Sequence, residues 1–379
     1  MAEGINIKPS RNYGIDLLRM FAMFLVVVLH VLGQGGVLGS AAKSDINYNA
    51  AWILEIGAYC AVNCYALISG YVGLNSKFKY TNIIMLWLRV LFYTVGITLV
   101  FQFVMPEALE PTPDSTALYL ISEKWDRALF PVSEKQYWYF TAYFLCYFFT
   151  PILNKAVQTI ERKLMKRTII MLVAIISIPT LYTGVDVFGA VKGYSALWLV
   201  ILYLVGAYMK KYNSLSHIGK IQAFAGFVSC VAVTWAVKLS VEEFIPQFKR
   251  ANILISYTSP TIIGTGIFLF VLFKNINPPA FCCKIIGFFA PLAFSVYIIH
   301  VHPLFWEHVM KGWFAPIGEL SLPLMIIAVI GASLGLYFAC SVVDLIRHYL
   351  FKLLRLQKLV FTLEMKIADK FNKKEEDAL

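Results

Sequence analysis

The stretch Arg11–His30, RNYGIDLLRMFAMFLVVVLH, determines how the rest of the chain is interpreted. An apolar helix is predicted here, yet it carries Asp16, Arg19 and His30. Arg19 and His30 are eleven positions apart, about three helical turns with a residual of roughly 20°, so both project from one face about 16 Å apart along the axis. Asp16 precedes Arg19 by three positions and is expected to pair with it. The stretch therefore predicts a cation and a histidine on one stripe of one helix.

The composition places this helix in a membrane. Of the 379 residues, 59% are apolar, 15% aromatic and only 15% charged, so a soluble domain of this length would lack polar surface. Each crossing needs about 20 apolar residues. Ten such segments are expected, at residues 15–33, 48–72, 81–105, 137–155, 168–184, 194–209, 220–238, 251–273, 284–306 and 323–345.

The positions of Lys and Arg in the loops predict the orientation of the spans in the membrane. They fall in the short connections before odd-numbered and after even-numbered spans, whereas the long connection 106–136 is acidic on balance. We therefore predict an all-α polytopic membrane protein with about ten transmembrane helices and both termini in the cytoplasm. The net charge of +11 is explained by inside loops and anionic membrane lipids, so no nucleic-acid partner is expected. A transmembrane domain is predicted over 1–349 and a cytoplasmic tail over 350–379, with an amphipathic helix at 350–374.

Three residues are candidate catalytic groups. His30 in the first span, Glu55 in the second and His300 in the ninth are expected at similar depths. A carboxylate would orient an imidazole and support its charged form, although Glu55 is near enough to the outer boundary to be solvated instead. His300 and His302 face different ways on a helix, which argues against a two-histidine metal site. No metal is expected.

Four residues near the cytoplasmic side are candidates for binding an anionic donor. Arg19 and Arg89 are expected at similar depths and would converge on one vestibule, because guanidinium groups chelate phosphate oxygens in pairs. Asp16 would hold Arg19, and Arg11 would lie at the interface. Each arginine also has a structural alternative. Arg11 would snorkel to the headgroups, and the other two would be neutralised by acids inside the bundle.

Polar and aromatic side chains supply a candidate substrate site. Asn63, Tyr65 and Ser69 follow one another along the second span, and Tyr297 lies in the ninth. Trp138 opens the fourth span within an aromatic cluster. Such rings either stack on a sugar or anchor the helix at the membrane interface.

The first helix, GIDLLRMFAMFLVVVLH, resembles the Asp-x-x-Arg and Arg-x10-His signature of the acyltransferase-3 family of integral membrane proteins. Shorter segments agree in order. They are ISGY in the second span, Lys79 to Arg89 opening the third, YWYF before the fourth, YLVGAY in the sixth and FSVYIIHVHP in the ninth. The resemblance covers about residues 11–310.

This resemblance implies transfer of an acyl group, usually acetyl, from cytoplasmic acyl-CoA to a hydroxyl of a glycan or another cell-surface molecule. It implies a multi-pass protein of the bacterial cytoplasmic membrane, with acetyl-CoA as the donor substrate. His30 is then the catalytic residue and Arg19 its essential partner. His30 would act either as a general base or as a transient acyl carrier. Tyr65, Asn63 and Ser295 are candidate oxyanion donors.

Two other classes of function stay open. A transporter or flippase for a lipid-linked or anionic small molecule would also need intramembrane Arg, Glu and His, although no inverted repeat is visible. A sensor or assembly subunit would keep the fold without catalysis. The sequence also leaves open the acceptor, an acetyl or a succinyl donor, and the oligomeric state, with a homodimer as one option.

Overall fold

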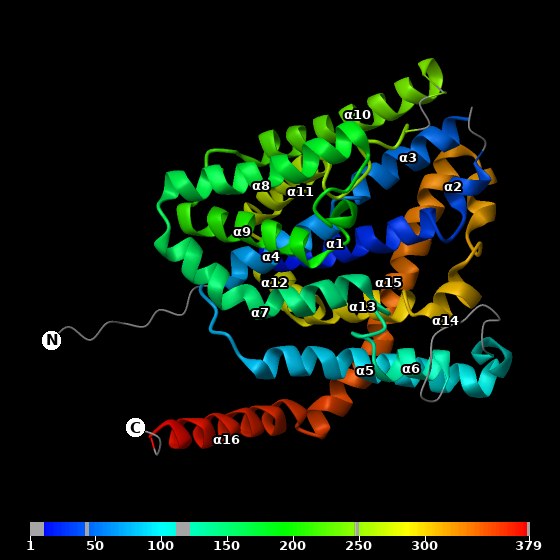
Figure 1. Cartoon of the computed structure of the whole chain (residues 1–379). Helices are drawn as coiled ribbons and strands as arrows, with labels where there is room; N and C mark the ends of the chain where they lie inside the picture. Colours follow the sequence, from blue (N-terminus) through cyan, green and yellow to red (C-terminus); the bar gives the residue numbers. More distant parts are fainter. Residues whose placement is uncertain (1–10, 42–44, 111–121, 246, 248–249, 377–379) are drawn as a thin grey trace.

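The computed structural model describes residues 11–41, 45–110, 122–245, 247 and 250–376, with side chains to residue 370, and every regular element in these ranges is helical. The first residues of α1 and the last of α16 lie at the same end of the molecule (Figure 1). Seven helical segments are long and apolar enough to cross a membrane, which confirms an all-helical polytopic architecture. They are Tyr13–Ser40, Ile46–Gly73, Tyr80–Val104, Arg162–Thr183, Lys220–Phe244, Ala280–His300 and Leu322–Leu353.

The other three expected spans are also helical, but that they cross the membrane stays a prediction. They correspond to α7 (Trp138–Thr159), α9 (Ala196–Tyr212) and the short apolar α11 (Pro260–Lys274). The expected start of the eighth span at residue 251 is wrong, because residues 251–259 form turns. Pro260 then occupies the first helical turn, where its missing N–H costs nothing.

Two of the expected spans are interrupted, and both interruptions lie beside the site described below. The second span divides into α3 (Ile46–Ala58) and α4 (Ala61–Gly73), and the ninth divides into α12 (Ala280–Phe289) and α13 (Ala293–His300) around the turn η4 (Ala290–Leu292). The remaining helices are α1 (Tyr13–Leu32), α2 (Val37–Ser40), α5 (Tyr80–Val104), α6 (Glu123–Leu129), α8 (Arg162–Thr183), α10 (Lys220–Phe244), α14 (Pro303–Phe305), α15 (Leu322–Leu353) and α16 (Leu356–Glu376). Within the 106–136 connection, residues 111–121 lie outside the described residues.

Helix α1 forms the centre of the bundle. Asn12 caps its N-terminus by accepting a hydrogen bond from the Ile15 N–H at 3.1 Å. Its apolar side chains are buried against α3, α4, α11, α13 and α15, and Leu18 and Val27 are fully inaccessible. Because α1 is packed on all these sides, the positions of its polar side chains are fixed relative to the neighbouring helices.

Two glycines let α4 and α9 cross with their backbones in contact. A Cβ atom on Gly206 would lie 2.1 Å from the carbonyl oxygen of Leu67, and one on Gly70 would lie 1.9 Å from that of Tyr203. Small residues at such crossings allow the close packing that stabilises helix pairs in membranes.

We expect Gly206→Ala to lower the stability of the protein by about 1–3 kcal/mol, because the added methyl group forces the two backbones apart. Thermal unfolding in detergent, followed by size-exclusion chromatography of the surviving protein, measures this effect. Gly331→Ala is the matched control, since a Cβ at this position in α15 meets nothing within 4 Å. Equal melting of the two variants would contradict the packing argument.

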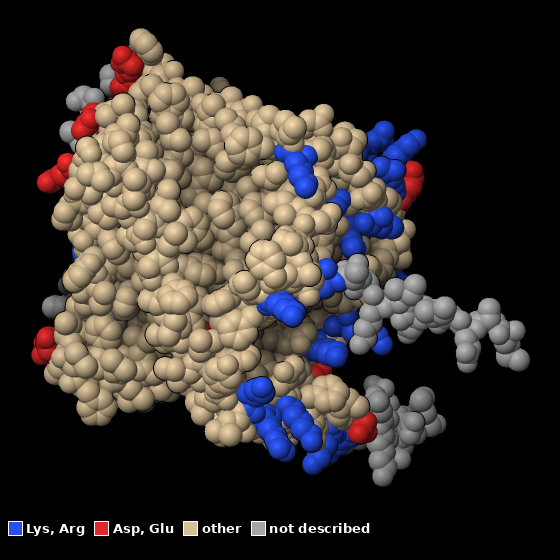
Figure 2. Space-filling model, turned by 180° about the vertical axis from the view of Figure 1, so that it is seen from behind, with Lys and Arg blue, Asp and Glu red and all other residues tan. Residues whose placement is uncertain are grey.

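Basic side chains concentrate at one end of the molecule. In Figure 2, Lys and Arg gather around the end where α16 projects, whereas Asp and Glu dominate the opposite end. This distribution matches the expected asymmetry of the loops. The cytoplasmic location of the basic end remains a prediction.

Helix α16 docks on the first turn of α5. The helix break lies at Leu354 and Arg355, after α15 has continued four residues past the predicted domain boundary at 349. The Glu364 carboxylate accepts hydrogen bonds from the N–H of Tyr80 at 2.8 Å, from the N–H of Thr81 at 3.0 Å, and from the Thr81 hydroxyl. It therefore caps α5, whose own N-cap residue makes no side-chain hydrogen bond. The tail forms a helix over Leu356–Glu376, and its amphipathic contact with a membrane interface stays a prediction.

The hydrogen bond from the Thr81 hydroxyl, with those from the two backbone N–H groups, lowers the pKa of Glu364. A carboxyl with a lowered pKa stabilises the docked state above its unfolded value of about 4.3, and this contribution is lost as the pH falls through the folded value. We therefore expect the separation between spin labels on α5 and α16 to increase below about pH 4.3. Glu364→Gln should remove this pH dependence, and an unchanged transition in that variant would contradict the assignment.

Candidate active site

His30 and His300 come together across 270 residues of sequence, with Nδ1 of His30 2.8 Å from Nε2 of His300. Nδ1 of His300 lies 2.5 Å from the carbonyl oxygen of Val296. A carbonyl can only accept, so Nδ1 of His300 donates, and in the neutral ring its Nε2 is an acceptor. We therefore assign the proton of that hydrogen bond to Nδ1 of His30. This tautomer leaves a lone pair on Nε2 of His30.

The chain after α13 completes the surroundings of this pair. His302 caps the short α14, because its Nδ1 accepts from the N–H of Leu304 at 3.3 Å. Trp306 then meets the His30 ring edge to face, with 4.8 Å between the ring centroids. The two paired imidazoles thus come from the last turns of α1 and α13, and the indole comes from the π-helical turn Trp306–Met310 that follows α14. Trp306 was not identified by sequence reasoning, because nothing in its spacing distinguishes it from an interfacial tryptophan.

Glu55 does not pair with His30. It lies on α3, separated from α4 by the interruption at Tyr59 and Cys60, and its carboxylate interacts electrostatically with Tyr59 and Tyr257. Its Oε2 atom is buried without a hydrogen-bond partner among the described side chains and backbone. Of the two partners that depth in the membrane suggested for His30, the structure brings together only His300. Depth alone could not tell them apart, because it ignores how the interruption rotates α3.

His30 lines a narrow cavity between α1, α4, α7 and α13 whose wall is largely aromatic. Trp138 stacks on Tyr257 with ring centroids 5.9 Å apart. The Tyr297 hydroxyl is buried and donates no hydrogen bond within the described part of the chain, and its oxygen faces the backbone of Tyr139. The Tyr65 hydroxyl is engaged, since it donates to the carbonyl oxygen of Arg19 at 2.7 Å. All four side chains line the cavity with His30.

Two further cavities adjoin the His30 cavity on the side of the basic end of the molecule. The first, of about 320 Å³, shares Tyr65, Tyr139 and Phe294 with the His30 cavity and is also lined by Arg19, Ser69 and Lys77. The second, of about 420 Å³, shares Ser76, Lys77 and Phe78 with the first and adds Lys155. We call the three together the inner path. From the basic end inward, its successive cavities are lined by Lys155 and Lys77, then by Arg19, and finally by His30.

The predicted pairing of Asp16 with Arg19 is present. Asp16 accepts a hydrogen bond from Nη1 of Arg19 at 2.8 Å and a second from Nε of Arg11 at 2.5 Å. The Arg19 side chain retains 30% of its exposure, so the guanidinium is held by one carboxylate oxygen and still faces the inner path. Charge-assisted pairs of this kind fix a guanidinium in place for a second anion.

Arg89 does not share a cavity with Arg19, so the expectation of a single vestibule is wrong. Nη1 of Arg89 donates to the carbonyl oxygen of Pro291 at 3.0 Å, and the side chain lines a different cavity between α5, α15 and α16. Asn82 and Leu86, on the same stripe of α5, form the wall between the two cavities and line both. Similar depth in the membrane did not determine which way this side chain points.

Asn63 and Ser69 have structural partners. The Asn63 amide donates to the Tyr257 carbonyl oxygen at 2.9 Å and accepts from the Trp198 indole at 3.1 Å. Asn63 is fully buried and does not line the His30 cavity, so it is not positioned to bind substrate or an oxyanion. Ser69 donates to the Tyr65 carbonyl oxygen at 2.9 Å and lines the inner path.

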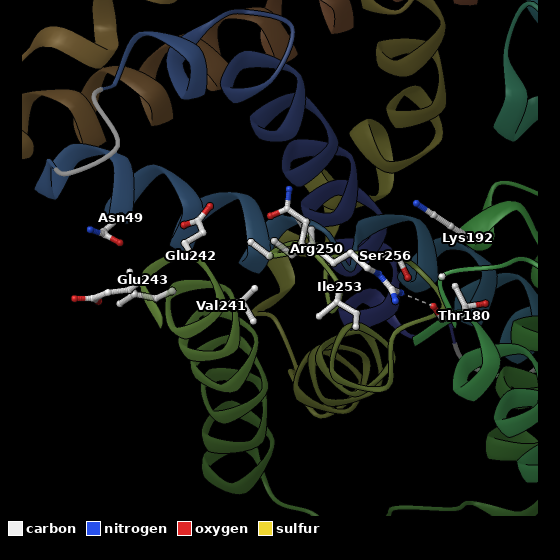
Figure 3. A pocket seen from close by; sticks show the side chains of 14 residues that line it. Asn49, Thr180, Lys192, Val241, Glu242, Glu243, Arg250, Ile253 and Ser256 are labelled. Carbon is white, nitrogen blue, oxygen red and sulfur yellow. Dashed lines mark hydrogen bonds between the residues drawn. The ribbon is translucent and has the colours of Figure 1, made fainter. Parts of the chain in front are cut away.

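A separate cavity of about 880 Å³ opens at the end of the molecule opposite to the basic one. Asn49 comes from α3, Glu242 and Glu243 come from α10, and Arg250 reaches the carbonyl oxygen of Thr180 at 3.1 Å (Figure 3). Ser256 also lines this outer cavity, directly before Tyr257 of the His30 cavity in the chain. Tyr257 also contacts the ring of Tyr194, with centroids 4.8 Å apart, and that of Tyr59 at 4.9 Å. Tyr257 thus belongs to an aromatic cluster at the His30 cavity, and the outer cavity next to it in the chain is lined by polar and aliphatic side chains.

A family model described as an acyltransferase domain, that of the acyltransferase-3 family, matches residues 12–342. Comparisons with curated proteins and with solved structures give no match. The matched range contains His30, His300 and the whole inner path.

Proposed function

The chain belongs to the acyltransferase-3 family, and we propose that it is a membrane O-acyltransferase. It moves an acyl group from cytoplasmic acyl-CoA to a hydroxyl of an extracytoplasmic glycan or other cell-surface acceptor. Acetyl is the expected acyl group. The observation that carries this proposal is the His30–His300 hydrogen bond of 2.8 Å at the closed end of the inner path. It leaves a basic nitrogen in a cavity that a donor from the basic end can reach.

The inner path suits the donor. Lys77, Lys155 and Arg19 follow one another toward His30, so the phosphates would lie among cations while the uncharged arm continues inward. Arg19 and His30 are on one continuous helix, and their eleven-residue separation corresponds to about 16 Å. A donor anchored by its phosphates near Arg19 would thus present its thioester to His30.

In the proposed reaction, Nε2 of His30 takes the proton of the acceptor hydroxyl while the hydroxyl oxygen attacks the thioester carbonyl. The tetrahedral oxyanion accepts a hydrogen bond from the Tyr297 hydroxyl, which donates to no other group among the described residues. The intermediate then expels the CoA sulfur, which receives the proton from Nε2. His300 acts on His30 alone, by fixing its tautomer and orientation.

The outer cavity is the proposed acceptor side. Its amide, carboxylate and hydroxyl groups match the hydroxyl-rich surface of a sugar, and the Tyr59, Tyr194, Tyr257 and Trp138 rings of the aromatic cluster at the His30 cavity offer apolar faces for stacking. This chemistry favours a glycan over a hydrophobic acceptor.

The proposed function is tested with purified protein in proteoliposomes. Two quantities are measured, the release of CoA thiol and the transfer of radiolabelled acetyl from acetyl-CoA to envelope glycans. Turnover that depends on acetyl-CoA supports it. Uptake or flipping of a labelled solute without any CoA release would instead support the transporter alternative and overturn the acyltransferase mechanism.

We expect Tyr297→Phe to lower kcat by about 10²-fold, the loss seen when one oxyanion donor is removed. Binding of acetyl-CoA should be unchanged, because the ring that lines the cavity is retained. Tyr337→Phe is the matched control, since its hydroxyl also donates no hydrogen bond in the described structure but lines none of the three cavities of the inner path. Equal turnover by Tyr297→Phe and wild type would exclude Tyr297 as the oxyanion donor.

A further inference from the structure

The cavity between α5, α15 and α16 is separate from the proposed donor and acceptor sites. It has a volume of about 960 Å³, and we call it the basic cavity. Six cationic side chains line it, and no acidic side chain does so among the described residues. The cations are Lys79, Arg89, Arg347, Lys352, Arg355 and Lys358.

Part of this positive charge is uncompensated. Lys79 interacts electrostatically with Glu364, and Arg89 with Asp344. Arg347 is neutralised by Asp344 through two hydrogen bonds of 2.7 Å. Within the described part of the chain, the other five cations form no ion pair. Nε of Arg89 is buried and has no hydrogen-bond partner there. Lys352, Arg355 and Lys358 have no ion-pair partner among the described residues and repel one another, so their arrangement is stabilised when an anion binds between them.

The backbone at the corner of the cavity supports the same conclusion. Arg355 joins α15 to α16 in the left-handed conformation, with φ of 51°, which side chains other than glycine seldom adopt. The corner brings Lys352, Arg355 and Lys358 to the same cavity from two helices. A left-handed residue is a common way to end a helix, and here it sets the angle at which α16 leaves α15.

Apolar side chains indicate where the anion comes from. Met85, Leu86, Phe351 and Phe361 line the same cavity. Beside it, Leu353 at the end of α15 is 79% exposed and Leu354 in the following break is 55% exposed, which suits contact with acyl chains rather than with water. The cavity also lies at the basic end of the molecule, around α16 (Figure 2). Basic pockets between membrane helices are suited to phospholipid headgroups.

We propose that the basic cavity binds the phosphate of an anionic phospholipid headgroup, with the acyl chains lying along the exposed leucines at the end of α15. This site goes beyond the acyl-transfer function and does not depend on it. A soluble phosphate offers the same chemistry to the cations, so the test must separate the two sources.

Native mass spectrometry measures lipid binding to the full-length protein in detergent. The protein is titrated with phosphatidylglycerol or with phosphatidylcholine. We expect preferential binding of phosphatidylglycerol, reduced about tenfold or more in the variant Lys352→Gln, Arg355→Gln, Lys358→Gln. The matched control is Lys163→Gln, Lys166→Gln, Arg167→Gln, which removes the same charge from exposed positions of α8. The control should bind as the wild type does, and both variants should elute as monodisperse protein.

Equal binding of phosphatidylglycerol by the wild type and by the triple variant at 352, 355 and 358 would overturn the proposal. An equal loss of binding in the α8 control would also overturn it. Millimolar inorganic phosphate or CoA forms the second arm. Little displacement of the lipid by these solutes supports the lipid headgroup. Full displacement by either would show that the cavity takes a soluble phosphate and would overturn the proposal.

Discussion

His30→Ala is expected to reduce acyl transfer by about 10³-fold or more while leaving the affinity for acetyl-CoA within about twofold of wild type. The reason is positional. His30 lies at the closed end of the inner path, whereas the cations proposed to hold the donor phosphates lie at its other end and are untouched by the substitution. Stopped-flow release of CoA thiol measures turnover, and calorimetry with acetyl-CoA measures binding.

Two further variants make the His30 experiment specific. His308→Ala removes an exposed histidine that lines no cavity of the inner path, so it should retain wild-type turnover. His300→Gln keeps an acceptor near Nδ1 of His30 and should lose less activity than His300→Ala, which leaves the tautomer unfixed. If His30→Ala retained full turnover, the sensor or assembly alternative would replace the catalytic one. If the two His300 variants were equally impaired, the positioning role of His300 would be wrong.

The first helix shows what could be predicted from sequence. Asp16, Arg19 and His30 belong to one helix, and local geometry depends only on residue spacing. Their common stripe and the Asp16–Arg19 pair were therefore predictable, and the structure confirms that pair at 2.8 Å. The helical segments were predictable for a similar reason, because bilayer thickness fixes how long an apolar run must be.

The predictions that depended on contacts between distant helices were less successful. Glu55, Arg89 and Asn63 were each placed at a plausible depth, but depth does not define the direction of a side chain around the helix axis. The interruption after Ala58 separates Glu55 from α4, and the stripe of α5 that carries Arg89 forms a wall between two cavities. Asn63 is fully used by the Tyr257 carbonyl and the Trp198 indole. The rotation of one helix about its axis relative to another cannot be predicted from a single sequence.

Arg19→Ala is expected to raise the dissociation constant for acetyl-CoA by about 10- to 100-fold, because a hydrogen bond to a charged group contributes about 1.5–3 kcal/mol. The fold should tolerate the change, since Asp16 keeps its hydrogen bond from Arg11 at 2.5 Å. Calorimetric titration in detergent measures the constant, and Arg19→Lys should recover part of the affinity through its charge alone.

Arg89→Gln is the informative comparison for Arg19→Ala, because the sequence-based prediction and the structure place the Arg89 side chain in different cavities. A single vestibule predicts that both arginines bind the donor phosphates, so both variants should weaken binding. The structure places Arg89 in the basic cavity, beyond the wall formed by Asn82 and Leu86, so Arg89→Gln should leave the dissociation constant within about twofold of wild type. Equal weakening by both variants would mean that the donor extends across that wall, and the basic cavity would then belong to the donor rather than to a lipid. Weakening by Arg19→Ala alone would place the donor phosphates on the inner path, on the same helix as His30.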